Sequence, residues 1–118
     1  MSWQNRIISA EQAAGKVRSG ERIFLTGNCS TPQAFLRALL ERHKEVREVE
    51  VVQLLGFGPD EYITPDLSEH IRINSLFIAP NVRKAINTGL ADFTPVFLSE
   101  IPGLFRSGRL VLDVAVVQ

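Results

Sequence analysis

The chain has 118 residues and a mass of 13.1 kDa, with 13 Lys+Arg residues against 13 Asp+Glu residues. This neutral balance argues against a nucleic-acid partner or an anionic membrane, because both attract clustered positive charge. With 45% hydrophobic and 22% charged residues, the composition is that of one globular domain rather than of a disordered chain or a coiled coil.

The cysteine content and the first residues point to a reducing compartment. Cys29 is the only cysteine, which excludes an internal disulfide framework and a multi-cysteine zinc site. The sequence opens with no apolar stretch long enough for a signal peptide or a membrane span. We therefore expect a cytoplasmic protein without a membrane partner.

The first third of the sequence predicts a helix, a strand and a second helix. Ser9 and Gln12 form a capping-box pattern for a helix that stops at Ser19-Gly20. The apolar run within residues 22–26 predicts a short buried strand that ends at Gly27. Thr31 and Pro32 then predict the N-cap and first residue of a helix, with Phe35, Leu36, Leu39 and Leu40 as its apolar stripe.

The same order of elements recurs further along the chain. A second strand is predicted over residues 49–55, and it too is followed by glycine. Residues 60–72 are rich in turn formers, with one helical turn around 67–70, and a third strand is expected over 73–79. The last part predicts a helix carrying Val82, Ala85, Ile86 and Gly89, a short helix capped by Ser99, and a fourth strand over 110–117.

Strands that are apolar on both faces and alternate with amphipathic helices indicate βαβ units. The predicted fold class is α/β, with a mainly parallel open sheet and helices on both faces. Ligands of such sheets gather beyond the carboxyl ends of the strands, yet the sequence stops at residue 118 on a strand. We therefore expect a truncated chain that lacks part of its own site.

One loop is a candidate for anion binding. The segment from Gly27 to Pro32 lies between a strand and a helix start, where backbone N–H groups and the helix dipole can receive a carboxylate or a phosphate. Ser30 and Thr31 add hydroxyl groups. Helix capping alone also explains Thr31-Pro32, and on spacing alone that structural interpretation is favoured.

The other motifs carry little chemistry by themselves. Gly56-Phe57-Gly58 follows a strand but lacks the third glycine and the immediate helix of a dinucleotide fingerprint, and no Walker-type phosphate loop is present. Cys29 has no convincing partner base, since a structural or solvated role is favoured for both His43 and His70. No metal site is expected. Glu100 favours the start of the last helix, and Arg83 is either an anion contact or an exposed helix residue.

The order of motifs resembles the N-terminal part of the acetyl-CoA hydrolase/transferase family, which includes 4-hydroxybutyrate and related CoA-transferases. The longest similar stretch runs from Asn81-Val82-Arg83-Lys84-Ala85 through Asp92-Phe93-Thr94-Pro95 and Phe97-Leu98-Ser99-Glu100 to Leu112-Asp113-Val114-Ala115. Ser9 to Ala13 and the Gly27 to Pro32 loop are similar to the family's opening helix and first strand-end loop. The resemblance covers essentially the whole chain.

The resemblance implies a NagB/RpiA/CoA-transferase type of fold, with residues 1–118 as the N-terminal part of a CoA-transferase domain and the C-terminal catalytic domain absent. Family members transfer CoA between carboxylates through a glutamyl-CoA thioester. That glutamate belongs to the C-terminal domain, beyond Gln118, so no catalytic residue is assigned here. The implied partners are an acyl-CoA, a small carboxylate and the missing domain, in a full-length protein that is expected to be a homo-oligomer.

We expect the substrate side of the site to be formed by two loops and the start of one helix, with a coenzyme A thioester as substrate and no permanently bound cofactor. The residues in this hypothesis are Gly27, Asn28, Ser30, Thr31, Gly56, Gly58, Asn81 and Arg83. Two other function classes stay open. One is a non-catalytic module that binds a small anion or an acyl-CoA, and the other is an assembly piece with Trp3, Phe57 and Phe93 as contact residues.

Overall fold

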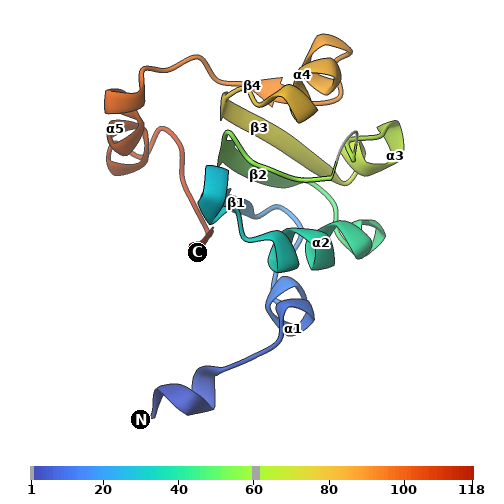
Figure 1. Ribbon diagram of the computed structural model, residues 1–118, viewed down its shortest axis with the longest axis vertical. Helices are drawn as coiled ribbons and strands as arrows, with labels where there is room; N and C mark the ends of the chain where they lie inside the picture. The colour runs from blue at the N-terminus through green and yellow to red at the C-terminus, as the bar shows by residue number, and fades with distance from the viewer. Residues whose placement is uncertain (1, 60–61) are drawn as a thin grey trace.

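The computed structural model describes residues 2–59 and 62–118, and within them five strands form one parallel sheet (Figure 1). The strand order is β4-β3-β2-β1-β5, and every neighbouring pair is parallel. The strands are β1 Arg22–Leu25, β2 Val49–Leu54, β3 Ile71–Phe77, β4 Asp92–Phe93 and β5 Val114–Val116. The α/β class and the parallel sheet are confirmed.

Helices connect these strands and cover both faces of the sheet. They are α1 Ala10–Ala14, α2 Gln33–Glu41, α3 Pro65–Ser68, α4 Pro80–Asn87 and α5 Ile101–Arg106, with short 3₁₀ turns at Trp3–Arg6, Asn28–Ser30, His43–Glu45 and Leu98–Glu100. In Figure 1, α5 lies on one side of the sheet, and the other helices lie on the opposite side. The prediction of helices on both faces is therefore confirmed.

The larger core lies between the sheet and helices α1 to α4. Strand residues such as Ile23, Val51 and Ile73 are fully buried there against Leu36 and Val82 of α2 and α4. A smaller core lies under α5, where Ile101, Leu104 and Phe105 pack over Phe24, Val52 and Leu76. The rings of Phe24 and Phe105 meet edge to face, with centroids 5.5 Å apart.

A row of polar side chains crosses the amino-terminal end of the α5 side of the sheet. Arg22 Nε donates to Glu50 Oε2 at 2.6 Å, and Asn74 Nδ2 donates to Glu50 Oε1 at 2.8 Å. Thr94 Oγ1, just after β4, donates to Asn74 Oδ1 at 2.8 Å. These hydrogen bonds give partners to the polar side chains of Arg22, Glu50 and Asn74, which are half-buried or buried. Polar and charged side chains can therefore lie within strands whose sequences are mostly apolar.

Two predicted helix starts are wrong. A 3₁₀ turn at Asn28–Ser30 precedes α2, which begins at Gln33 and not at Pro32, and Thr31 is not its N-cap. Ser99 lies inside another 3₁₀ turn, and Glu100 is the residue that precedes α5. By contrast, the capping box of Ser9 and Gln12 is confirmed, with Gln12 N donating to Ser9 Oγ at 3.1 Å and Ser9 N donating to Gln12 Oε1 at 2.9 Å.

Several strand and turn limits also differ from the predictions. Strand β3 begins at Ile71 rather than at residue 73, and the two-residue β4 was not predicted. The helical turn is at Pro65–Ser68, where Thr64 Oγ1 accepts from Leu67 N, while residues 60 and 61 of the predicted turn region lie outside the described residues. The last strand covers only Val114–Val116, which pair with Ile23, Phe24 and Leu25 of β1.

Candidate functional site

The loops that follow β1 and β2 are joined to each other at the carboxyl edge of the sheet. Asn28 N donates to Leu55 O at 3.0 Å, and Phe57 N donates to Thr31 Oγ1 at 3.1 Å. Gln33 Nε2, at the start of α2, donates to Phe57 O at 2.6 Å. The peptide groups on both sides of Phe57 are thus held by the first loop and by the start of α2, and the two predicted loops form one structural unit.

Hydrogen bonds extend this unit to the neighbouring strand ends. Leu55 N donates to Phe77 O at 3.1 Å, which ties the second loop to the end of β3. Thr26 N donates to Val116 O at 3.2 Å, which ties the end of β1 to β5. The carboxyl ends of β5, β1, β2 and β3 therefore lie in one continuous row, which is where ligands of open α/β sheets bind.

Close packing explains the three glycines of these loops. A Cβ atom on Gly27 would lie 1.7 Å from the backbone oxygen of Leu54, and one on Gly56 would lie 2.4 Å from Gln53 Oε1. A Cβ atom on Gly58 would lie 3.0 Å from the ring of Tyr62. None of the three adopts a positive φ angle. The glycines therefore allow the loops to approach their neighbours, which is a structural requirement in addition to any ligand contact.

Left-handed backbone occurs at both loops in residues other than glycine. Asn28 has a φ of 52° and Leu55 a φ of 45°. Asparagine tolerates this region, but for leucine the conformation is strained, and such strain persists only where surrounding contacts hold it. The hydrogen bonds that link Asn28, Leu55 and Phe77 supply those contacts.

The backbone of the first loop is less available to an anion than the sequence predicts. Asn28, Ser30, Thr31 and Gln33 each donate their N–H group inside the protein, to Leu55 O, Gly27 O, Asn28 O and Thr31 O respectively. These groups hold the loop in shape because it forms a 3₁₀ turn and not a direct helix start. The expected cradle of free N–H groups is therefore corrected: the exposed part of the loop is Asn28, Cys29 and Ser30.

Thr31 also differs from its expected place. It is 2% exposed, and its hydroxyl donates to Asn28 O at 2.8 Å while it accepts from Phe57 N. The hydroxyl thus joins the two loops from inside and does not face the solvent, contrary to its predicted place among the ligand contacts. Sequence periodicity holds no sign of this contact, because Thr31 and Phe57 are 26 residues apart.

Asn81 and Arg83 lie in the first turns of α4. Both polar side-chain atoms of Asn81 are buried without a hydrogen-bond partner among the described residues, and Asn81 lines a cavity of about 240 Å³ beside Thr64 and Thr88. Arg83 is exposed. Within the described ranges, no hydrogen bond or ion pair joins either side chain to the two loops, so they stand apart from the loop unit.

Two buried polar side chains that were not predicted lie on β2 and β3, near the second loop. Gln53 and Ser75 are register partners on β2 and β3 and are at most 1% exposed. Gln53 Nε2 and Ser75 Oγ have no hydrogen-bond partner in the part of the chain that the structure describes. Burial raises the pKa of Tyr62 to about 12, with hydrogen bonding to Gln53 acting in the opposite direction. A glutamine inside the apolar run of β2 was the available signal.

The histidines and the cysteine show no catalytic arrangement in the described residues. His43 Nδ1 lies 2.7 Å from Leu40 O at the end of α2, as predicted, and His70 is buried with Nδ1 2.8 Å from Val46 O. Cys29 is free and exposed. Within residues 2–59 and 62–118, no group of three or more His, Cys, Asp or Glu side chains is placed to hold a metal ion. No helix in these ranges is long and apolar enough to cross a membrane.

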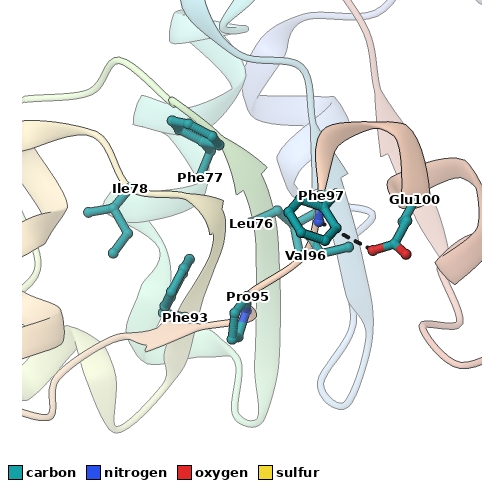
Figure 2. A pocket seen from close by; sticks show the side chains of 8 residues that line it. All are labelled: Leu76, Phe77, Ile78, Phe93, Pro95, Val96, Phe97 and Glu100. Carbon is teal, nitrogen blue, oxygen red and sulfur yellow. Dashed lines mark hydrogen bonds between the residues drawn. The ribbon is translucent and has the colours of Figure 1, made fainter.

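A second hollow lies between the end of β3 and the segment after β4 (Figure 2). We call it the aromatic groove. Its volume is about 550 Å³, and among the described residues Glu100 is the one titratable residue in its lining. The lining residues are Leu76, Phe77, Ile78, Phe93, Pro95, Val96, Phe97 and Glu100.

Solved structures with the same arrangement define the class of fold. RipA from Yersinia pestis superposes with a TM-score of 0.78 at 17% identity, over 98% of this chain and 29% of that one. A variant of the decarboxylase AibA/AibB superposes with a TM-score of 0.60 at 18% identity, over 89% of this chain and 44% of that one. These superpositions show that the chain shares its open, parallel α/β fold with both proteins.

The chain belongs to the acetyl-CoA hydrolase/transferase family, because residues 1–118 match its N-terminal domain. It is 32% identical over 122 residues to the 4-hydroxybutyrate coenzyme A transferase of Clostridium kluyveri, a match that covers 100% of this chain and 28% of that protein. It is 36% identical over 111 residues to the succinyl-CoA:acetate/propanoyl-CoA:succinate CoA transferase of Fasciola hepatica, a match that covers 92% and 23%. The chain spans about a quarter of the length of these relatives.

Proposed function

We propose that this chain is the N-terminal, substrate-side portion of an acyl-CoA:carboxylate CoA-transferase of the 4-hydroxybutyrate or acetyl-CoA type. The observation that carries the proposal is the loop unit at the carboxyl edge, in a chain that matches the family's N-terminal domain along its whole length. The two relatives described above are CoA transferases, which supports the same class of reaction for the full-length protein.

The proposed reaction uses a glutamate side chain outside this chain, beyond Gln118. Its carboxylate becomes a glutamyl-CoA thioester as the first acid leaves, and the second acid then takes the CoA group. Coenzyme A enters as the substrate thioester, and no permanently bound cofactor is part of the proposal. The 118-residue chain alone is therefore expected to transfer no CoA.

The part of this chain in the reaction is to bind and orient the acid. In this proposal the exposed Asn28 and Ser30 contact the acyl group or the carboxylate, and Thr31 joins the two loops from inside. Arg83, which is exposed on α4 and stands apart from the loop unit, supplies in this proposal a positive charge that attracts the carboxylate. We further propose a cytoplasmic homo-oligomer for the full-length protein.

A steady-state assay of the native gene product tests the site. Ser30→Ala and Arg83→Ala are expected to raise KM for the accepting carboxylate by roughly 10-fold to 100-fold, the loss typical of a hydrogen bond to a charged group. Arg37→Ala, an exposed arginine on α2, is the matched control and should leave KM unchanged. Unchanged kinetic constants in both site variants would show that this placement of the site is wrong.

The mass of the native gene product and a calorimetric titration test whether further polypeptide completes the site or the 118-residue chain binds the substrate by itself. A product much heavier than 13.1 kDa that transfers CoA supports a site completed by further polypeptide. Tight binding of a CoA ester by the 118-residue chain alone, without transfer in the gene product, would instead support a binding module.

A further inference from the structure

We infer that the aromatic groove is an internal docking surface, covered in the full-length protein by an apolar helix or strand of the polypeptide beyond residue 118. The inference rests on the proposed function, in which this chain is one portion of a longer transferase. It goes further by assigning an occupant and a chemistry to a surface at the end of β3, next to the second loop, whose Leu55 N–H donates to Phe77 O.

The α5 side of the sheet is only partly covered. Helix α5 packs over Phe24 and Val52, on β1 and β2. The aromatic groove at the end of β3 and beside β4 is left open, and its phenylalanines are exposed (Figure 2). Parallel sheets occur almost only with both faces covered by other elements. This part of the face therefore lacks the cover that its strand type requires.

The groove is a continuation of the smaller core. Leu76 is 1% exposed and belongs to both, and Val96 packs against that core while it lines the groove. Three phenylalanines on the rim are exposed: Phe77 by 53%, Phe93 by 44% and Phe97 by 77%. Aromatic side chains clustered beside a core and open to water are typical of a surface that another element covers.

The charge of the groove restricts what can occupy it. Glu100 stands at one end, where its carboxylate accepts from Phe97 N at 3.4 Å (Figure 2). A small carboxylate or a CoA phosphate would be repelled by Glu100 and would find no cationic side chain among the described lining residues. The occupant that fits is a run of aliphatic side chains with a lysine or arginine facing Glu100.

The size of the groove favours an occupant on the same polypeptide over a second copy of the chain. Stable interfaces between separate proteins use roughly 20–30 residues a side, whereas eight residues line this groove. A segment joined covalently is present at a high effective concentration and needs less contact area. Relatives such as the Clostridium kluyveri enzyme have ample further chain, since this one covers 28% of it.

Thiol labelling in the native gene product tests this inference. In a background in which Cys29 and every further cysteine of the gene product are replaced by serine, Phe97→Cys places the one reactive thiol in the groove, and Glu41→Cys places the matched control on the exposed side of α2. The groove thiol is expected to react with a neutral maleimide at least about tenfold more slowly in the gene product than in the 118-residue chain. The control thiol should react at nearly equal rates in both.

Equal rates for the groove thiol in the two proteins would overturn the inference. The inference would also be overturned if the groove thiol of the 118-residue chain became protected as the concentration of that chain rises. That outcome would identify a second copy of the chain as the occupant. Phe93→Cys repeats the test if Phe97→Cys fails to fold by circular dichroism. The CoA-transferase activity of the same gene product is measured in parallel. If the product transfers CoA but its groove thiol is unprotected, only this inference is overturned. If the groove thiol is protected but the product transfers no CoA, only the proposed reaction is overturned.

Discussion

At the scale of single residues, Gly27 packs directly against the end of β2. A Cβ atom there would overlap the Leu54 backbone oxygen, which belongs to a strand and cannot rotate away. We expect Gly27→Ala to lower the free energy of unfolding by about 1–3 kcal/mol or more, the usual cost of overpacking. Urea denaturation of the 118-residue chain measures this.

The control for that prediction is another glycine of the same chain. Gly103 lies inside α5, and a Cβ atom there would have no neighbour within 4 Å. Gly103→Ala is expected to stabilise the chain by roughly 0.5–1 kcal/mol, because alanine loses less backbone entropy in a helix. If Gly27→Ala and the unmodified chain have the same free energy of unfolding, the close contact between Gly27 and the Leu54 backbone oxygen is contradicted.

Thr31 is the second residue whose role depends on a distant partner. Thr31→Val keeps the shape of the side chain but leaves the Phe57 N–H without an acceptor, at an expected cost of about 1–2 kcal/mol. Thr31→Ser keeps the hydroxyl and should lose less. Amide hydrogen exchange is the decisive measurement, since Phe57 should exchange faster in the valine variant, and unchanged exchange there would refute the link.

At the scale of elements, a small cluster joins the end of α2 to α3. Both ring nitrogens of His43 face acceptors, Leu40 O at 2.7 Å and Asp66 Oδ2 at 2.8 Å, so both can donate only in the imidazolium form. The pKa of the Asp66 carboxyl is lowered from 3.8, chiefly by the hydrogen bond from His43, with the charge of Lys44 acting in the same direction.

The sign of the pH dependence follows from the lowered pKa of Asp66. A carboxyl with a lower pKa in the folded state stabilises it above the unfolded pKa, and this stabilisation is lost as pH falls through the folded pKa. The difference in urea midpoint between the unmodified chain and Asp66→Asn should therefore shrink below about pH 4. Glu69→Gln, at the end of the same helix, is the control, and a difference that stays constant for Asp66→Asn would contradict the pairing.

Element limits were predictable where a residue acts on its own neighbours. Ser9 caps α1 because its partner, Gln12, is three residues away, and the same local pattern is readable in any sequence. Thr31 was misassigned because its hydroxyl bonds to Phe57, a contact that only the folded sheet creates. Strand β4 escaped prediction because two residues show no periodicity, and the length of β5 depends on its partner β1.

At the scale of the whole molecule, the predicted positions of the two loops were correct, whereas the contacts between the loops were not predicted. Glycine after each buried strand placed two loops at one sheet edge, which the structure confirms for Gly27 and Gly56. The sequence could not show that the loops use their own N–H groups, that Gln53 and Ser75 lie buried beneath them, or that Asn81 stands apart. Each of these depends on strand register and on packing between distant segments.

Asp113 attaches the strand at one end of the sheet to its neighbour, although the sequence predicted it only as an interruption of an apolar strand. Its carboxylate accepts from Arg22 N at 2.8 Å, and its own N–H donates to Arg22 O at 2.9 Å, which fixes the last strand on β1. Asp113→Ala should cost about 1–2 kcal/mol and speed amide exchange at Thr26, which donates to Val116 O. Asp113→Asn retains an acceptor oxygen and should lose less. If both variants match the unmodified chain in urea midpoint and in exchange at Thr26, the edge strand is held by its backbone pairing alone.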